Sequence, residues 1–358
     1  MKAILYNDPS GPALQDVPMP TPAAGGALIQ VEACGLCGTD LLKLRENKTG
    51  AVLGHEVVGR VRELGGGDGQ SRGGAALRGN ASPDAAQDCS LPLAAVRVGD
   101  RVILGHHVPC GRCHYCLRDS PSMCAQFKAT NVSPGGFAQF LSVSPLHLAR
   151  TVFKIPDDLP AASACHIEPL ACCVRNARRL GLKAGDRAAV VGLGSIGLLT
   201  AQLLRLSGAE ILGLDLDAER VKAAAPWAEG FSSAEDLRQK ALALTDGRGL
   251  DAVVITAGPA ALATQSLSWL RHGGTLNIFA APHPSPAPVD FADLYHRELR
   301  VFSSYSAAPE DLRRALELIV SGAVALDALA AKPYPLESFA QAVDDALNRR
   351  VMKALLVP

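Results

Sequence analysis

The sequence has no excess of charge of either sign, because 35 lysines and arginines balance 35 aspartates and glutamates in its 358 residues. This balance removes the electrostatic basis for binding nucleic acid or an anionic membrane surface, so a small molecule is the expected partner. The sequence also has no apolar run long enough to span a membrane. Its first residues, Met1 to Tyr6, lack a charged segment followed by an apolar one. No secretion leader is therefore predicted, and a cytoplasmic location is expected.

Ten cysteines in such a chain indicate a reducing compartment, where thiols are kept for metals or for packing. Four of them lie close together, at Cys110, Cys113, Cys116 and Cys124. A closed set of four thiolates is typical of structural zinc, because it leaves no open coordination position. The alternative is a disulfide pair or four unrelated buried thiols.

The length predicts two domains. Short strand-like segments separated by glycine and proline run to about Leu148, and apolar strands alternate with amphipathic helices from about Pro169, which predicts a parallel α/β sheet. The strands are expected at 27–31, 57–61, 101–104, 188–191, 211–214, 252–255 and 353–357, with helices at 198–206 and 309–321. The expected domains are 1–168 and 169–300, followed by a segment 301–358 that returns to the first domain. Residues 65–95, rich in glycine, alanine and serine, are predicted to be a flexible surface insertion, with Cys89 as a free thiol.

A second group of ligand-type residues precedes the four-cysteine lobe, namely Cys37, His55 and Glu56. Thiolate and imidazole together favour zinc. Taken separately, His55 could be a hydrogen-bonded core histidine, and Cys34 with Cys37 could be a redox pair.

A glycine-rich turn follows the apolar strand at 188–191 and opens a helix, with a second strand ending at Asp215. Its residues are Gly192, Leu193, Gly194, Ser195, Ile196 and Gly197. Such a turn places helix amides against a pyrophosphate. Asp215 would bind the adenosine ribose and repel a 2′-phosphate, so NAD is expected rather than NADP.

Taken together, these motifs resemble the zinc-dependent alcohol and polyol dehydrogenases of the medium-chain dehydrogenase/reductase superfamily over nearly the whole chain. The motifs appear in that family's order: Cys37-Gly-Thr-Asp40, Gly54-His-Glu56, the four-cysteine lobe and the glycine-rich turn. The resemblance implies a GroES-like β-rich catalytic domain and a Rossmann domain with a doubly wound parallel sheet, with the active site in the cleft between them. It also implies two zinc ions per chain, NAD, and a homodimer or homotetramer formed through the Rossmann sheet.

By the same resemblance, Cys37 and His55 are ligands of a catalytic zinc and Glu168 is the third, as in the polyol and threonine dehydrogenases. Cys165, Cys172 and Cys173 are rival candidates, and Glu56 can exchange with Glu168 and water. The resemblance makes Thr39 the first proton acceptor and Asp40 the partner that orients His55. Thr39 could instead only cap the next helix. Ile196 and Arg220 should touch the cofactor, although Arg220 could equally lie on a solvated helix face.

The implied reaction is NAD-dependent oxidation of a secondary alcohol in a polyol-like, cyclitol, sugar or amino-alcohol substrate. Two positions depart from relatives: Leu42 stands where many have a relay histidine, and Ser303 stands where sorbitol dehydrogenases have an arginine. The rival functions are a zinc-independent enone or quinone reductase of the same fold and a non-catalytic zinc or NAD-binding protein. Such proteins would be expected to lack Cys37, His55 or Thr39, and this sequence retains all three.

Overall fold

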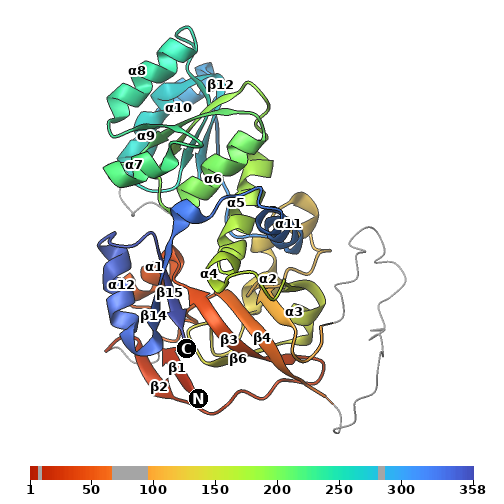
Figure 1. Cartoon of the computed structure of the whole chain (residues 1–358). Helices are drawn as coiled ribbons and strands as arrows, with labels where there is room; N and C mark the ends of the chain where they lie inside the picture. The colour runs from red at the N-terminus through yellow and green to blue at the C-terminus, as the bar shows by residue number, and fades with distance from the viewer. Residues whose placement is uncertain (7–9, 67–95, 281–286) are drawn as a thin grey trace. The chain divides into compact units, whose positions relative to one another are not determined.

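The computed structural model describes residues 1–6, 10–66, 96–280 and 287–358. The predicted insertion lies outside the described residues except for its first two positions, and so does Cys89. The chain divides into two compact units (Figure 1). The first unit comprises 1–168, 307–320 and 330–358, and the second comprises 169–306 and 321–329. No helix among the described residues is long and apolar enough to cross a membrane.

The first unit is built on a mostly antiparallel sheet of seven strands. Their order is β14-β15-β3-β4-β5-β7, with β6 paired to β3, and only β14 and β15 run parallel. The strands are β3 (Ala27–Gly35), β4 (Glu56–Leu64), β5 (Arg101–Leu104), β6 (Phe140–Val143), β7 (Val152–Lys154), β14 (Ala331–Pro335) and β15 (Lys353–Val357). A hairpin of β1 (Lys2–Leu5) and β2 (Ala13–Asp16) stands beside this sheet as a separate pair. The strands expected at 27–31, 57–61, 101–104 and 353–357 are thus confirmed.

One strand pairing brings distant parts of the sequence together. Strand β15 lies antiparallel to β3, with Leu356 opposite Cys34 and Leu355 opposite Gly35, and Figure 1 shows β15 in blue and β3 in orange-red. Apolar side chains from both strands, among them Ile29 and Leu356, enter the same buried core. The pairing therefore places the start of β15 beside the segment that leads into helix α1 (Gly38–Arg45).

The remaining helices of this unit are short or amphipathic. Helix α11 (Pro309–Val320) confirms the helix expected near 309–321, and it buries Leu312, Ala315 and Ile319 along one face. The others are α2 (Ala125–Ala129), α3 (Pro145–Arg150), α4 (Ala161–Ala164) and α12 (Phe339–Leu347), and α5 (Ile167–Leu180) begins where the first unit passes into the second.

The second unit contains a six-stranded sheet in which every neighbouring pair is parallel, in the order β10-β9-β8-β11-β12-β13. Numbered from β8 along the chain, this is the 3-2-1-4-5-6 order of a Rossmann fold, which binds dinucleotides where the strand order reverses, beside the first strand. The strands are β8 (Arg187–Val191), β9 (Glu210–Leu214), β10 (Glu229–Phe231), β11 (Leu250–Ile255), β12 (Leu270–Ile278) and β13 (Arg300–Ser303). The helices are α6 (Ser195–Leu206), α7 (Ala218–Ala224), α8 (Ala234–Leu244), α9 (Ala260–Ser266) and α10 (Phe291–His296).

The central strands of this sheet are buried along almost their whole length, as strands covered by helices on both faces must be. The predicted strands at 188–191, 211–214 and 252–255 and the helix at 198–206 are confirmed. The predicted fold class, a GroES-like β-rich part with a doubly wound parallel sheet, is also confirmed.

Candidate functional site

The candidate centre forms where β3 passes into α1. Cys37 is the residue that caps the start of this helix, and its backbone N–H donates to Asp40 Oδ2 at 3.2 Å. The other carboxylate oxygen, Asp40 Oδ1, accepts from the backbone N–H of Gly54 at 3.1 Å. A single buried carboxylate therefore fixes both Cys37 and the residue before His55.

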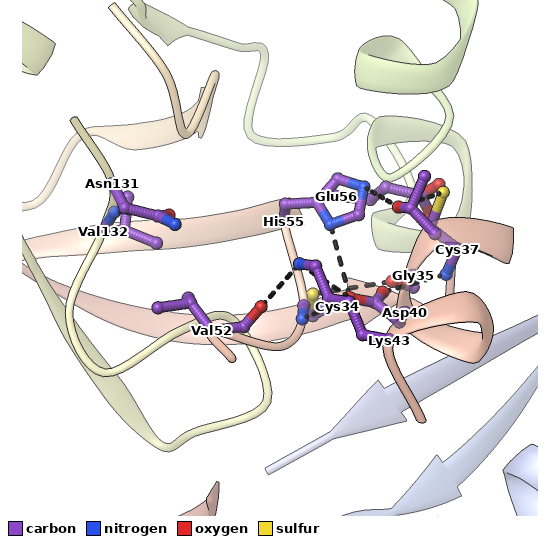
Figure 2. A network of polar contacts seen from close by, with 12 residues as sticks. Cys34, Gly35, Cys37, Asp40, Lys43, Val52, His55, Glu56, Asn131 and Val132 are labelled. Carbon is purple, nitrogen blue, oxygen red and sulfur yellow. Dashed lines mark hydrogen bonds and ion pairs between the residues drawn. The ribbon is translucent and has the colours of Figure 1, made fainter. Parts of the chain in front are cut away.

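Three donor groups converge at this point, namely the sulfur of Cys37, a ring nitrogen of His55 and a carboxylate oxygen of Glu56. These atoms all lie within 4.8 Å of one another (Figure 2). His55 Nδ1 faces Asp40 Oδ1 at 3.6 Å, and His55 Nε2 lies 3.5 Å from Thr39 Oγ1. Thr39 Oγ1 also donates to Cys37 Sγ at 3.3 Å, so the Nε2 side of the imidazole shares this hydroxyl with the thiol.

The negative charges around His55 favour a positive charge at this place, either on the imidazole or on a bound metal ion. Burial alone would lower the pKa of His55, but the negative charges of Asp40 and Cys37 outweigh it and raise the pKa well above its ordinary value. Burial likewise acts to raise the pKa of Asp40, yet the attraction of His55 and Lys43 leaves it below its ordinary value. His55 Nδ1 is buried without a well-formed hydrogen bond, and Asp40 is the group it faces. This donor set of thiolate, imidazole and carboxylate fits zinc, with a carboxylate behind the histidine as is usual for a metal ligand.

Glu56 has a partner that sequence reasoning missed. Its Oε2 forms an ion pair with Lys353 Nζ at the start of β15, and both side chains are almost fully buried. Gly35 leaves room for this pair, because a Cβ at that position would overlap the Glu56 carboxylate. A lysine at the start of an apolar strand normally suggests a solvent-exposed strand end. Only the pairing of β15 with β3 shows that Lys353 is buried beside Glu56.

Glu168 stands at the start of α5 and is buried. Burial raises the pKa of Glu168 to about 7, and the charges of His55 and Glu56 also act on it. In the described part of the chain, the tight donor group holds Cys37, His55 and Glu56 but no atom of Glu168. Glu168 therefore lies in the electrostatic surroundings of the centre, and its role as third ligand stays a prediction.

The rival cysteines occupy other environments. Burial raises the pKa of Cys165 to about 12, which opposes the thiolate form that a metal ligand needs. The thiol of Cys173 approaches the carbonyl of Ile196 at 3.7 Å in the second unit. Its neighbour Cys172 also lies on α5 and is half-buried.

The four-cysteine lobe forms a second donor group, and its sulfurs too lie within 4.8 Å of one another. Cys116 Sγ is 3.9 Å from Cys110 Sγ and 3.6 Å from Cys113 Sγ, far beyond a disulfide bond of about 2.0 Å. Four sulfurs at about 2.3 Å from a tetrahedral zinc would lie about 3.8 Å apart. The lobe, which Cys124 completes, therefore has the dimensions of a closed zinc site.

The glycine-rich turn joins β8 to α6 as the sequence suggests. Gly192 has φ 91, and a Cβ on Gly197 would overlap the Gly192 carbonyl oxygen, so this helix can approach the strand only with glycine there. Gly194 caps α6, and Ser195 and Ile196 form its first turn with amides that have no partner within the helix.

Asp215 follows β9 and reaches back to this turn. Its Oδ2 accepts from the Leu193 backbone N–H at 2.7 Å, and its Oδ1 accepts from that of Asp217 at 3.0 Å. Arg220 Nη1 lies 3.9 Å from Asp215 Oδ2, and the Arg220 side chain is only 18% exposed. Arg220 therefore faces Asp215 and the turn and is not a fully solvated side chain.

Comparison with known proteins gives a consistent result. The family model of the alcohol dehydrogenase GroES-like domain matches residues 23–157, and that of the zinc-binding dehydrogenases matches 195–321. D-arabinitol dehydrogenase 1 of Uromyces fabae is 27% identical, and the alignment covers 100% of this chain and 97% of that protein. L-threonine 3-dehydrogenase of Bacillus velezensis is 29% identical, with 100% and 99% covered. The solved structure of alcohol dehydrogenase TADH from Thermus sp. ATN1 superposes with a TM-score of 0.80 at 25% identity, over 100% of this chain and 99% of that one.

Proposed function

Since the chain belongs to the zinc-dependent alcohol and polyol dehydrogenases of the medium-chain dehydrogenase/reductase superfamily, we propose that it oxidises a secondary alcohol of a polar, polyol-like substrate with NAD. The observation that supports this most is the convergence of Cys37, His55 and Glu56 beside the hydroxyl of Thr39. The relatives named for arabinitol and threonine favour a hydroxylated substrate over a simple apolar alcohol.

Each residue of the centre has a distinct task in this proposal. Cys37 and His55 would hold the zinc, with Glu168 as the third ligand and Glu56 as a carboxylate that can exchange with it. Bound zinc acts as a Lewis acid and makes the substrate hydroxyl more acidic. Asp40 holds the imidazole from its Nδ1 side and leaves Nε2 directed toward the hydroxyl of Thr39.

Thr39 would receive the hydroxyl proton, and bound NAD would supply the acceptor for the hydride of the carbon that bears this hydroxyl. The products are a ketone, NADH and one proton. Position 42 holds leucine, so no histidine stands there to carry the proton onward. Thr39 is exposed, and we infer that it passes the proton directly to water.

The cofactor would lie at the amino end of α6, with its pyrophosphate against the amides of Ser195 and Ile196. The absence of side chains at Gly192, Gly194 and Gly197 would let the backbone of the turn come close to the pyrophosphate. Asp215 would bind the ribose hydroxyls, which favours NAD over NADP. Arg220 would flank the ribose beside Asp215.

A homodimer or homotetramer is part of the proposal. Strand β13 is an edge of the parallel sheet, and its Val301 is 46% exposed. Phe291 and Tyr295 of the preceding helix are 78% and 79% exposed. Among the described residues no strand pairs with the outer side of β13, and an edge flanked by exposed apolar side chains is suited to pairing with a second copy. Analytical ultracentrifugation would test this, and a monomer at micromolar concentration would contradict it.

We also propose a cytoplasmic location. None of the nine cysteines in the described part of the chain forms a disulfide. Five of the seven donors in the two groups are thiols, which must stay reduced to bind metal.

The decisive experiment combines zinc analysis with NADH formation across polyols, cyclitols, amino alcohols and simple alcohols. Two zinc ions per chain and turnover with NAD are expected. A zinc-independent reductase would bind none, and a scaffold that keeps only the lobe would bind one. Cys37→Ser should lose one ion and all turnover while the fold persists, and Cys113→Ser is the matched control that loses the other ion and mainly stability. Unchanged turnover in Cys37→Ser would refute the assignment of the centre.

A further inference from the structure

Four aromatic rings lie in a row that begins at His55 of the candidate zinc centre. The ring centre of His55 lies 4.6 Å from that of His106, which lies 4.0 Å from His107, which in turn lies 4.5 Å from Phe127. Both added histidines lie shortly after β5, which ends at Leu104, with Gly105 between. The chain thus places two imidazoles next to a proposed metal ligand, and the reaction described above uses neither.

The backbone that carries these histidines is held on both sides. His107 Nδ1 pairs with the carbonyl of Thr130, and the backbone N–H of Val108 donates to Thr130 Oγ1 at 2.8 Å. On the other side, the carbonyl of His106 accepts from His147 Nε2 at 3.0 Å. The position of His106 is therefore fixed before any substrate binds.

The ring of His106 has hydrogen-bonding capacity to spare. Within the residues that the structure describes, it contacts the rings of His55 and His107, and neither of its nitrogens forms a hydrogen bond. The side chain is half-buried. A neutral imidazole offers one donor and one acceptor, and a bound molecule that shields them from water must replace those hydrogen bonds or lose free energy.

We propose that His106 is a specificity-determining residue that binds a second hydroxyl of the substrate, on the carbon next to the one that is oxidised. The inference rests on the proposed function, which places the reacting hydroxyl at the Nε2 side of His55. A molecule bound there meets the edge of an imidazole whose ring centre lies only 4.6 Å from that of His106, with the two rings tilted by 38°.

The chemistry of the ring selects the substrate class. A hydroxyl both donates and accepts, so it can satisfy a neutral imidazole, whereas an ether or a carbonyl only accepts and an alkyl group does neither. His107 lies beside His106 and adds a second polar group, because Thr130 engages its Nδ1 and leaves its Nε2 for other partners. The favoured substrates are vicinal diols and longer polyols, and mono-alcohols are disfavoured.

The test compares propylene glycol with isopropanol, which share one carbon skeleton and differ by the second hydroxyl. Full-length, zinc-loaded protein is assayed with NAD as wild type, His106→Phe and His106→Gln. Phenylalanine keeps the ring contacts and removes both nitrogens, and glutamine keeps a donor and an acceptor without the ring. His114→Phe is the matched control, because that histidine lies in the lobe against Tyr115.

His106→Phe should lower the ratio of kcat/KM for propylene glycol to that for isopropanol about tenfold, as expected for loss of one buried hydrogen bond. His106→Gln should recover much of the ratio, and His114→Phe should leave it unchanged. As a measurement without turnover, propylene glycol is titrated into the NADH-bound protein and followed by NADH fluorescence. Its Kd should rise by a similar factor in His106→Phe.

An unchanged ratio and Kd in a His106→Phe variant that keeps both zinc ions would overturn the inference. An equal loss for both alcohols together with loss of one zinc ion would also overturn it, since His106 would then only support His55. Failure of the proposed function is a different result: wild-type protein with both zinc ions would form no NADH from any alcohol.

Discussion

Replacing Lys353 by methionine removes one charge from a buried pair and little else. The Lys353 and Glu56 side chains are only 5% and 1% exposed. Lys353 begins β15 and Glu56 begins β4, and the two side chains meet beside Gly35 of β3, the strand that lies between them. Methionine is unbranched and of similar length, so it keeps most of the apolar contacts of the lysine stem. The substitution therefore leaves Glu56 buried without its cation.

The expected loss of stability is about 3–5 kcal/mol, the cost of removing one member of a buried ion pair. Adding Glu56→Gln to Lys353→Met should recover most of the loss, because no uncompensated charge then remains.

The assay is urea unfolding of wild type, both single variants and the double variant, all prepared with the same zinc content. Lys332→Met is the matched control on the neighbouring strand β14, where the lysine pairs with Asp345 but is 57% exposed. Such a surface pair contributes little, so this variant should stay close to wild type. The reasoning fails if Lys353→Met is no less stable than Lys332→Met, or if the double variant shows no recovery.

Three further substitutions test other parts of the structure. Asp215→Ser should lower kcat/KM for NAD at least about tenfold and raise that for NADP, because hydrogen bonds from the ribose to a charged group are lost; an unchanged cofactor ratio would contradict the assignment. Thr39→Val should lower kcat about 10²–10⁴-fold with Thr39→Ser active, and an active valine variant would exclude Thr39 from proton transfer. Burial lowers the pKa of His147, whose Nδ1 lies 2.7 Å from Ser144 Oγ, so the folded state favours the neutral ring. Stability should therefore fall as pH drops below about 6.5, where the unfolded chain takes up the proton first, and His147→Gln should flatten that part of the profile in urea unfolding; equal slopes would refute it.

Local patterns in the sequence are sufficient for much of the fold. Strands such as 101–104 and 252–255 are short apolar runs between turns, and their character does not depend on distant partners. The four-cysteine lobe is equally local, since all its donors lie between Cys110 and Cys124. Both could be predicted for that reason.

The centre itself depends on contacts between distant residues. Lys353 precedes the apolar run Ala-Leu-Leu-Val, and nothing in that run indicates which strand it will join or that the lysine will be buried. The choice between Glu56 and Glu168 as a ligand likewise depends on side-chain positions in the folded chain, which no spacing in the sequence encodes. The structure brings Glu56 into the tight group and keeps Glu168 at its margin.

The pairing of β15 with β3 also sets an order of events during synthesis. Glu56 precedes Lys353 by 297 positions. At about 5–20 residues per second, a ribosome needs about 15–60 s to cover that separation. All six strands of the parallel sheet, from Arg187 to Ser303, are translated within this interval. A nascent chain can therefore complete its nucleotide-binding sheet before Lys353, the ion-pair partner of Glu56, has been synthesised. A chain that stalls or is cut before Lys353 would contain every strand of the nucleotide-binding sheet. It would lack the lysine that pairs with Glu56 at the candidate zinc centre.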